Sequence, residues 1–532
     1  MNSDLSRDAR GTPRIRALLT VDAICIAVIL ILAIIGIGVP RFHSDSWSLF
    51  ELSKTFFVDF YRTTTFRQFE TSSLYSTAFP PLYPFLLALV CPIGNGIYAG
   101  IWLNAAICIG ILAAMHRLAD AVDLPRWAGN FTFVVLLATP GFFDDFVAAR
   151  TMPLAILLFV LLVDTFVRAM TFGFKDWSVV FTGMISGASV LTRFDFLLPS
   201  IAVGVMLLYF CEPSRRLRIG LGYLLGLLPL LAPWVAYSFV VHGQFWASDN
   251  MRTVMSVLPT HVLNFEPDSS AVHTLRNAPN EWVYSLLFIK APPVAIAIAK
   301  SALGNWPLVL SGIALFVVVL RRGTKASIEA IPRPLLVLLI PIAIQMSTIV
   351  LTGYTVPRYF TALTILIALL VLTAGVATMI EKAAPRVVVI AVAVLAASVP
   401  VRYGGLDLIG PRATVEFKQR AEFISTAQYA SLLKALQDTP KPRVLVMHNA
   451  SELGRFSDPA PPPFLDPYRF GALTGIETFP QPKNYSDSII ESFVRKFRIT
   501  HIYDPKGVAR PALEQSYHIA STEHPWLFRL EQ

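Results

Sequence analysis

Long runs of apolar residues recur from residue 17 to residue 403, and they set the strongest limit on how this chain can fold. Of its 532 residues, 55% are hydrophobic and only 15% are charged, whereas a soluble protein carries roughly a quarter charged residues. Windows of about 20 apolar residues, the length that crosses a bilayer, predict about eleven transmembrane helices. These windows lie at 17–39, 97–115, 127–141, 153–170, 177–192, 194–211, 217–241, 302–320, 335–352, 359–380 and 386–403. The sequence therefore predicts a polytopic α-helical membrane protein.

The basic residues decide the predicted orientation. Arg7, Arg10, Arg14 and Arg16 precede the first apolar run, which is longer than the about 7–15 residues of a signal-peptide core and has no small-residue cleavage site. We therefore expect a retained span with a cytoplasmic N-terminus. If the short run 80–92 lies at the external surface instead of crossing, the other Lys- and Arg-rich loops fall on the cytoplasmic side, as the positive-inside rule requires. The net charge of +9 thus reflects topology, and no nucleic-acid partner is predicted.

This topology leaves two long external loops and a polar tail. The first loop, 40–96, is too polar to span, and its aromatic residues predict interfacial helices. The second is 242–300. We expect a transmembrane domain over 1–403, with a small extracytoplasmic α/β domain over 404–532.

The tail is assigned to an α/β domain because helix-like and strand-like stretches alternate along it. Helical patterns occupy 415–436 and 486–497. Strand-like runs, RVLVMH and THIYD, occupy 443–448 and 500–504.

Charged residues gather at the external ends of the predicted spans. A charge near the membrane core costs roughly 2.5–3.5 kcal/mol on insertion scales, so such residues tend to be functional. They are Asp45, Asp144, Asp145, Arg150, Arg193, Asp195 and Arg358.

Acids and arginines on one membrane face suit an anionic, lipid-linked substrate. Transfer of a sugar from a polyprenyl phosphate needs a carboxylate to take the acceptor's proton, and fixed positive charge on the departing phosphate.

The order of these features resembles the GT-C superfamily of polyprenyl-phosphate-sugar glycosyltransferases, on the branch with protein O-mannosyltransferases and lipid A aminoarabinose transferases. The resemblance covers nearly the whole chain. It is carried by Asp45 early in the first external loop, Pro80-Pro81-Leu82 at its end, the acid–arginine loop FFDDFVAAR at 142–150, TRFDFLL at 192–198, Arg358-Tyr359, and the α/β tail. It implies that 1–403 is a catalytic domain in a bacterial inner membrane. It also implies an inverting transfer of a hexose or pentose to an acceptor hydroxyl on a lipid, glycan or protein.

The resemblance also implies a role for each matched residue. Asp45 would be the catalytic base. Arg358, with Arg193 and Arg150, would hold the donor phosphate. Asp144, Asp145 and Tyr359 would orient the acceptor or support the phosphate-binding groups. No metal ligands are predicted, because the histidines show no ligand spacing; the adjacent acids Asp144 and Asp145 could bind a divalent metal, but nothing implies one.

Two positions depart from the family pattern. Ser46 follows Asp45 where the family often has Glu, and Phe79 precedes the two prolines where His or Lys is common. The nearest basic replacements for the residue lost at position 79 are Lys54, Arg62 and Arg67.

Plainer explanations stand beside each assignment. Asp45 fits a helix N-cap in SDSW, and Asp144 and Asp145 could cap the next helix. Arg358 could be an interfacial side chain that reaches toward water. Two other classes of protein are also open: a transporter or flippase of a lipid-linked sugar, and a non-catalytic membrane scaffold with an external interaction domain.

Overall fold

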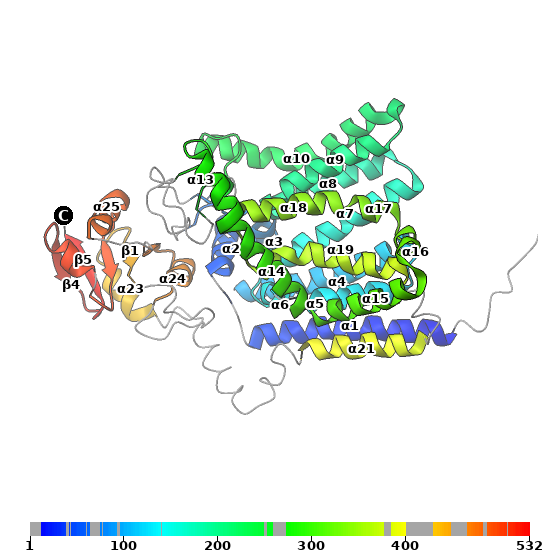
Figure 1. Cartoon of the computed structure of the whole chain (residues 1–532). Helices are drawn as coiled ribbons and strands as arrows, with labels where there is room; N and C mark the ends of the chain where they lie inside the picture. The colour runs from blue at the N-terminus through cyan, green and yellow to red at the C-terminus, as the bar shows by residue number, and fades with distance from the viewer. Residues whose placement is uncertain are drawn as a thin grey trace, which may run out of the picture.

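The computed structural model describes residues 12–38, 42, 44–59, 61–63, 75–76, 78–92, 96–139, 141–248, 253–258, 273–376, 385–400, 429–447, 465–481, 487–507 and 509–531. Figure 1 shows two parts, a bundle of long helices that run side by side and a small unit with a sheet at one end of the bundle. We call the bundle end next to this C-terminal unit the site end and the opposite end the basic end.

The helices of the bundle match the predicted spans one by one. They are α1 (Thr12–Gly38), α4 (Ala99–Ala121), α5 (Arg126–Leu137), α7 (Met152–Phe172), α8 (Asp176–Thr192), α9 (Leu197–Phe210), α10 (Arg216–His242), α15 (Trp306–Arg322), α17 (Arg333–Val337) with α18 (Leu339–Thr352), α19 (Thr361–Val371) and α21 (Pro385–Pro400). Among the described residues, six helical segments are long and apolar enough to cross a bilayer, and four shorter apolar helices accompany them. The predicted polytopic helical class is confirmed.

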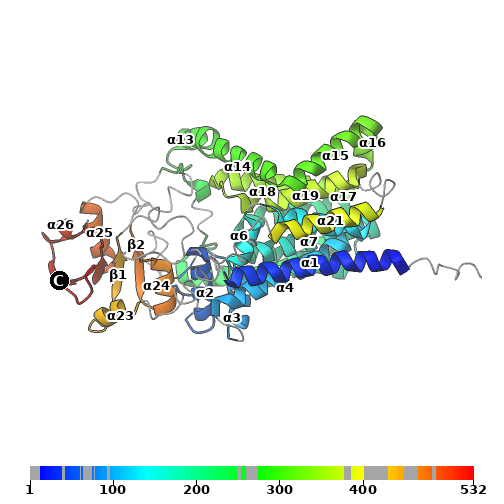
Figure 2. The same cartoon turned by 90° about the horizontal axis from the view of Figure 1, so that it is seen from below.

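The loop predicted at 242–300 is partly wrong. Its second half forms α13 (Pro279–Tyr284), a π-helical turn (Ser285–Lys290) and α14 (Ala291–Gly304). Together Pro279–Gly304 is one of the six long apolar segments, and α14 leads end to end into α15 (Figures 1 and 2). Charged residues and a Pro-Pro pair interrupt the hydropathy of this stretch. The two prolines come just after the π-helical turn, where the backbone hydrogen-bond pattern changes, and the helix continues through them.

Two short helices of the first loop lie at the site end. α2 (Ser44–Thr55) carries Asp45 in its first turn. α3 (Leu82–Val90) follows the Pro-Pro turn and has 9 residues, about 13 Å of helix against the ~30 Å of a hydrocarbon core. It is therefore too short to cross the bilayer, which agrees with the orientation predicted from the basic loops.

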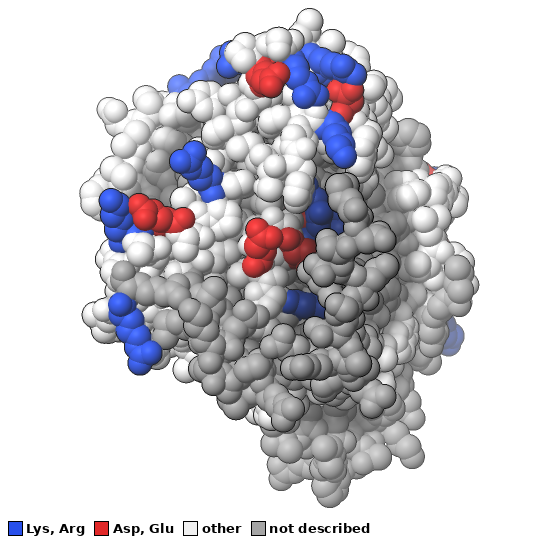
Figure 3. Space-filling view, turned by 90° about the vertical axis from the view of Figure 1, so that its right-hand side faces the viewer, with Lys and Arg blue, Asp and Glu red and all other residues white. Residues whose placement is uncertain are grey.

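The two bundle ends differ in charge. The basic end carries the Lys and Arg residues that the sequence assigned to one side of the membrane, and Figure 3 shows this end face on. They are Arg117, Arg126, Arg168, Lys175, Arg215, Arg216, Arg218, Arg321, Lys325 and Arg333. Several pair with acids there, as Arg126 does with Asp22 at 2.8 Å and Arg117 with Asp164 at 3.1 Å.

The C-terminal unit is an α/β fold, as predicted. Its five strands are ordered β2-β1-β3-β5-β4; β1 is parallel to β2 and β3, and β5 is antiparallel to β3 and β4. The strands are β1 (Arg443–Val446), β2 (Glu477–Pro480), β3 (His501–Tyr503), β4 (His518–Ser521) and β5 (Leu527–Glu531). The helices are α23 (Ala430–Leu436), α24 (Pro467–Thr474), α25 (Asp487–Phe497) and α26 (Arg510–Leu513).

The strand runs at 443–448 and 500–504 and the helix at 486–497 are thus confirmed as β1, β3 and α25. Helix α24 was not predicted. The end of the helix predicted at 415–436 is confirmed as α23, whereas its part before residue 429 and the predicted domain boundary at 403–404 lie outside the described residues.

Glycines let α8 and α10 pack with their backbones almost touching. A Cβ on Gly226 of α10 would lie 2.0 Å from the carbonyl oxygen of Val180, and one on Gly183 of α8 would lie 2.1 Å from that of Tyr223. These obstacles are backbone atoms that cannot rotate away. In contrast, a Cβ on Gly312 of α15 would meet nothing within 4 Å.

We predict that Gly226→Ala destabilises the bundle by about 1–3 kcal/mol, the usual effect of overpacking, because α8 and α10 must separate. Gly312→Ala is the matched control, with no change or a gain of about 0.5–1 kcal/mol from improved helix propensity. Thermal unfolding of the purified protein in detergent measures both. Equal effects of the two substitutions would contradict the close helix contact.

Candidate active site at the end of the bundle

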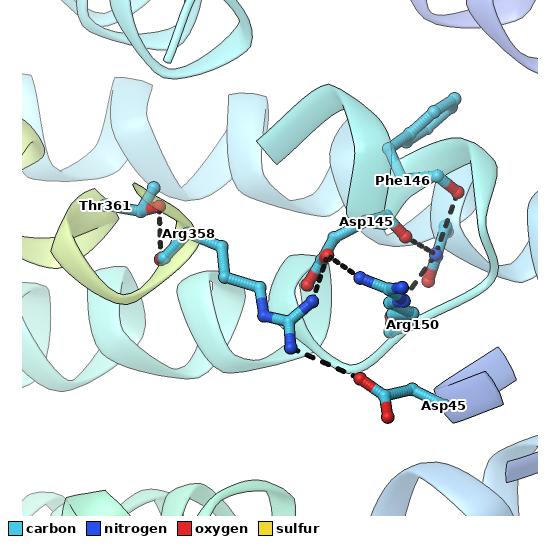
Figure 4. Close-up of polar contacts among 7 residues, drawn as sticks. Asp45, Asp145, Phe146, Arg150, Arg358 and Thr361 are labelled. Carbon is cyan, nitrogen blue, oxygen red and sulfur yellow. Dashed lines mark hydrogen bonds and ion pairs between the residues drawn. The ribbon is translucent and has the colours of Figure 1, made fainter. Parts of the chain in front are cut away.

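An arginine joins two acids from distant parts of the chain at the site end. Arg358 donates from Nη2 to Asp45 Oδ2 at 3.2 Å and from Nη1 to Asp145 Oδ1 at 3.3 Å. Arg150 Nη1 donates to the same Asp145 oxygen at 3.0 Å. Figure 4 shows the resulting line of alternating charges, Asp45–Arg358–Asp145–Arg150. The sequence predicted each of these residues as a site candidate, and the structure brings all four together.

Each member of this line comes from a short element at a bundle end. Asp145 lies on α6 (Phe142–Val147) and Arg358 on the 3-10 turn η6 (Pro357–Phe360) just before α19. The two elements approach closely because Gly141, with φ +85°, precedes α6: a Cβ there would lie 3.0 Å from the backbone nitrogen of Arg358. Glycine therefore supplies both the left-handed turn and the space.

Asn104, which sequence reasoning missed, holds the acidic loop in place. It is fully buried on α4, and its Nδ2 lies within 3.3 Å of the carbonyl oxygens of Asp145, Phe146 and Arg150. Tyr83, which follows Pro80-Pro81-Leu82, donates to Asn104 Oδ1 at 3.0 Å. The available signal was a polar amide in the middle of an apolar span, where such residues are costly and tend to be functional.

Burial separates the two acids that Arg358 joins. The Asp145 side chain is 3% exposed and the Asp45 side chain is 25% exposed. Two guanidinium groups compensate the buried Asp145 carboxylate, as a buried charge requires. Asp45 is thus the acid of this pair that a substrate can reach, while Asp145 fixes the arginines.

The neighbouring acid Asp144 is placed differently. Asp144 is half-buried, whereas Asp145 is buried and bonds both arginines. The sequence could not distinguish the two, because the turn that begins α6 decides which carboxylate points inward.

Arg193 and Tyr359 extend the cluster on the side of Arg358. The Arg193 guanidinium lies 4.4 Å from the centre of the Tyr359 ring, and that of Arg358 lies 5.3 Å from it. Asp195 accepts from Arg193 Nε at 3.0 Å and from Gln345 at 3.2 Å. Burial opposes the charge on Arg193, but Asp195 and Tyr359 outweigh burial and raise the pKa of Arg193. One phenol ring therefore lies beside two permanent cations.

The proposed replacements for a basic residue at position 79 do not join this cluster. Lys54 Nζ donates to the carbonyl of Ala472, and Arg62 pairs with Glu477 at 2.6 Å, both on the C-terminal unit. Arg67 lies outside the described residues. Phe79 instead contributes its carbonyl oxygen, which accepts from the Tyr61 hydroxyl at 2.9 Å. Burial raises the pKa of Tyr61 well above its usual range, so the phenol stays a donor.

No group of three or more His, Cys, Asp and Glu side chains suited to a metal ion occurs in the part of the chain that the structure describes. Between Asp45 and Asp145, the Arg358 guanidinium supplies the positive charge. Arg358 thus links the two acids, and the cluster presents one accessible carboxylate, that of Asp45, beside fixed cations that can bind an anion.

No family model and no curated protein matches this sequence, but comparison with solved structures finds similar chains. The crystal structure of ArnT from Cupriavidus metallidurans bound to undecaprenyl phosphate has a TM-score of 0.55 and 14% sequence identity, covering 96% of this chain and 97% of that chain. The archaeal oligosaccharyltransferase AglB from Archaeoglobus fulgidus, in complex with an inhibitory peptide and a dolichol-phosphate, has a TM-score of 0.43 and 12% identity, covering 95% and 74%. The first likeness confirms the predicted GT-C-type fold over nearly the whole chain.

We predict that Asp145→Asn destabilises the protein by about 3–5 kcal/mol, the usual result of removing one partner from a buried ion pair, since Arg150 and Arg358 both lose their shared carboxylate. Glu329→Gln at the basic end is the control, because the Glu329 side chain is 66% exposed and forms a surface pair with Lys325, so we expect a change within about 0.5 kcal/mol. Thermal unfolding in detergent distinguishes them. Similar losses of stability in the two variants would show that Asp145 does not anchor the cluster.

Proposed function

We propose that this protein is an integral membrane glycosyltransferase that moves a sugar from a polyprenyl phosphate to an acceptor hydroxyl, with inversion at the anomeric carbon. The observation that carries the proposal is the pairing of Asp45 with Arg358. These residues are 313 positions apart in the sequence, yet they place an accessible carboxylate and a half-buried guanidinium 3.2 Å apart at one bundle end.

The two groups match the two needs of this reaction. Asp45 takes the proton from the acceptor hydroxyl as the acceptor oxygen bonds to the anomeric carbon. The bond from that carbon to the phosphate oxygen breaks, and its electron pair leaves on the phosphate. The planar fork of Arg358 binds the phosphate oxygens through two N–H donors and stabilises the charge that develops there.

The other cluster residues take supporting roles in the proposal. Arg193 lies beside the same tyrosine ring as Arg358 and adds a second cation for the phosphate. Arg150 donates to Asp145 and holds that carboxylate in place. Asp145 in turn orients Arg358, so we assign phosphate binding to Arg358 and Arg193 before Arg150.

Two further observations support the proposal. The ArnT structure that shares this fold holds undecaprenyl phosphate, a carrier of the proposed chemical class. The positive-inside rule assigns the basic end to the cytoplasm. The site end and the C-terminal unit would then face the extracytoplasmic side of the plasma membrane, where the acceptor lipid, glycan or protein is met.

The test is donor turnover by the purified protein with a panel of polyprenyl-phosphate sugars and acceptors. We expect Asp45→Asn to lower kcat by about 10²–10⁴-fold, the usual contribution of a general base. Asp59→Asn is the matched control, because Asp59 lies in the same loop but is exposed and pairs with Arg62. It should retain wild-type turnover.

Equal turnover by Asp45→Asn and the wild type would refute the base assignment. If wild type left every donor intact but carried lipid-linked sugar across proteoliposomes, the flippase alternative would replace the enzyme.

A further inference from the structure

The helix that carries Asp45 is too short to hold its own position. α2 has 12 residues, and isolated helices of about this length are marginal in water. Asp45 lies in its first turn, so whatever packs against α2 determines where the carboxylate stands relative to Arg358. Figures 1 and 2 both show α2 between the bundle and the C-terminal unit.

The C-terminal unit contacts both ends of α2. Near the start of α2, the guanidinium of Arg469 on α24 lies 5.8 Å from the centre of the Trp47 ring, within the range of a cation–π contact. At the end of α2, Lys54 Nζ donates to the carbonyl oxygen of Ala472 at 2.9 Å. That carbonyl belongs to the last turn of α24, where helix carbonyls lack internal partners and attract cations.

A third contact follows shortly after α2. Arg62 Nη2 pairs with Glu477 at the start of β2 at 2.6 Å, and Arg443 on β1 pairs with the same carboxylate at 2.6 Å. Because Glu477 is tied to the sheet through Arg443, this pair connects the first loop to a rigid element.

Apolar packing joins the two parts as well. Ala472 of α24 is buried in the core of the bundle, whereas Phe470 of the same helix is buried in the core of the C-terminal unit with Tyr429. Trp47 and Arg469 are almost fully enclosed, with the arginine 1% exposed. A cation is costly to bury unless its surroundings compensate the charge. The contact between Arg469 and Trp47 therefore depends on how α24 is placed against α2.

We infer that the C-terminal unit is part of the catalytic machinery, with Arg469 and Lys54 as positioning residues that hold α2 so that Asp45 faces Arg358. This inference rests on the proposed function for the role of Asp45. The C-terminal unit would then position the catalytic base, a role that is separate from binding the acceptor.

The first experiment measures the helix itself. Hydrogen–deuterium exchange of the full-length protein reports the amides of residues 44–55. We expect Arg469→Met, which keeps an unbranched stem but removes the cation, to speed their exchange about tenfold through local opening, with the amides of α4 and α7 unchanged. Arg469→Lys should restore protection, since lysine also makes cation–π contacts. Lys434→Met is the matched control, because Lys434 pairs with Glu523 on the surface of the same unit.

The second experiment measures function in the same variants. Misplacing the base should lower kcat about tenfold or more while the Kd for polyprenyl phosphate stays within about twofold of wild type, since phosphate binding uses Arg358. Lys54→Met should act in the same direction, and it carries the test if Arg469→Met does not fold.

The outcomes separate the two claims. Unchanged exchange of α2 in both Arg469→Met and Lys54→Met would overturn the inference. Faster exchange with wild-type kcat would show that α24 holds α2 but does not position the base, which also overturns it. If the wild type consumed no donor, the proposed function would fail, and the exchange data alone would still decide whether α24 holds α2.

Discussion

The bridge that Arg358 makes between Asp45 and Asp145 is the interaction on which the rest of the site depends. It joins the first loop, the loop before α7 and the turn before α19 into one unit. A permanent cation can hold two carboxylates close together because it offers two donors in a rigid plane. Of these three groups Asp145 is the buried one, and Arg150 adds a second cation beside it, so that two acids and two arginines balance in charge.

The two aspartates that Arg358 joins, Asp45 and Asp145, have different roles. The buried Asp145 is committed to its arginines, whereas Asp45 is exposed enough to meet a substrate. A donor phosphate would compete with Asp45 for the Nη2 group of Arg358. Donor binding would therefore release the carboxylate when a proton acceptor is needed, which links the two halves of the reaction through one side chain.

The order of motifs along the chain was enough to predict Asp45, Asp145, Arg150 and Arg358, because polar residues at the ends of apolar spans are few and stand out. It was not enough to separate Asp144 from Asp145, since that depends on the left-handed turn at Gly141 and on the helix that follows. Asn104 and Arg469 were missed for a related reason: their partners are backbone carbonyls and a ring far away in sequence. Helix α14 was missed because charges and prolines obscured its apolar character, although a helix can continue through prolines where a π-helical turn changes the hydrogen-bond pattern.

The central claim is that Arg358 holds the donor phosphate while Asp45 stands beside it as the base. Equilibrium binding of polyprenyl phosphate to the purified protein tests it most directly. The account predicts that Arg358→Met weakens binding by at least about tenfold, the equivalent of one charge-assisted contact, while Asp45→Asn binds as tightly as the wild type or more tightly, because the competing carboxylate charge is gone. Wild-type affinity in Arg358→Met, or a loss of affinity in Asp45→Asn as large as that in Arg358→Met, would contradict it.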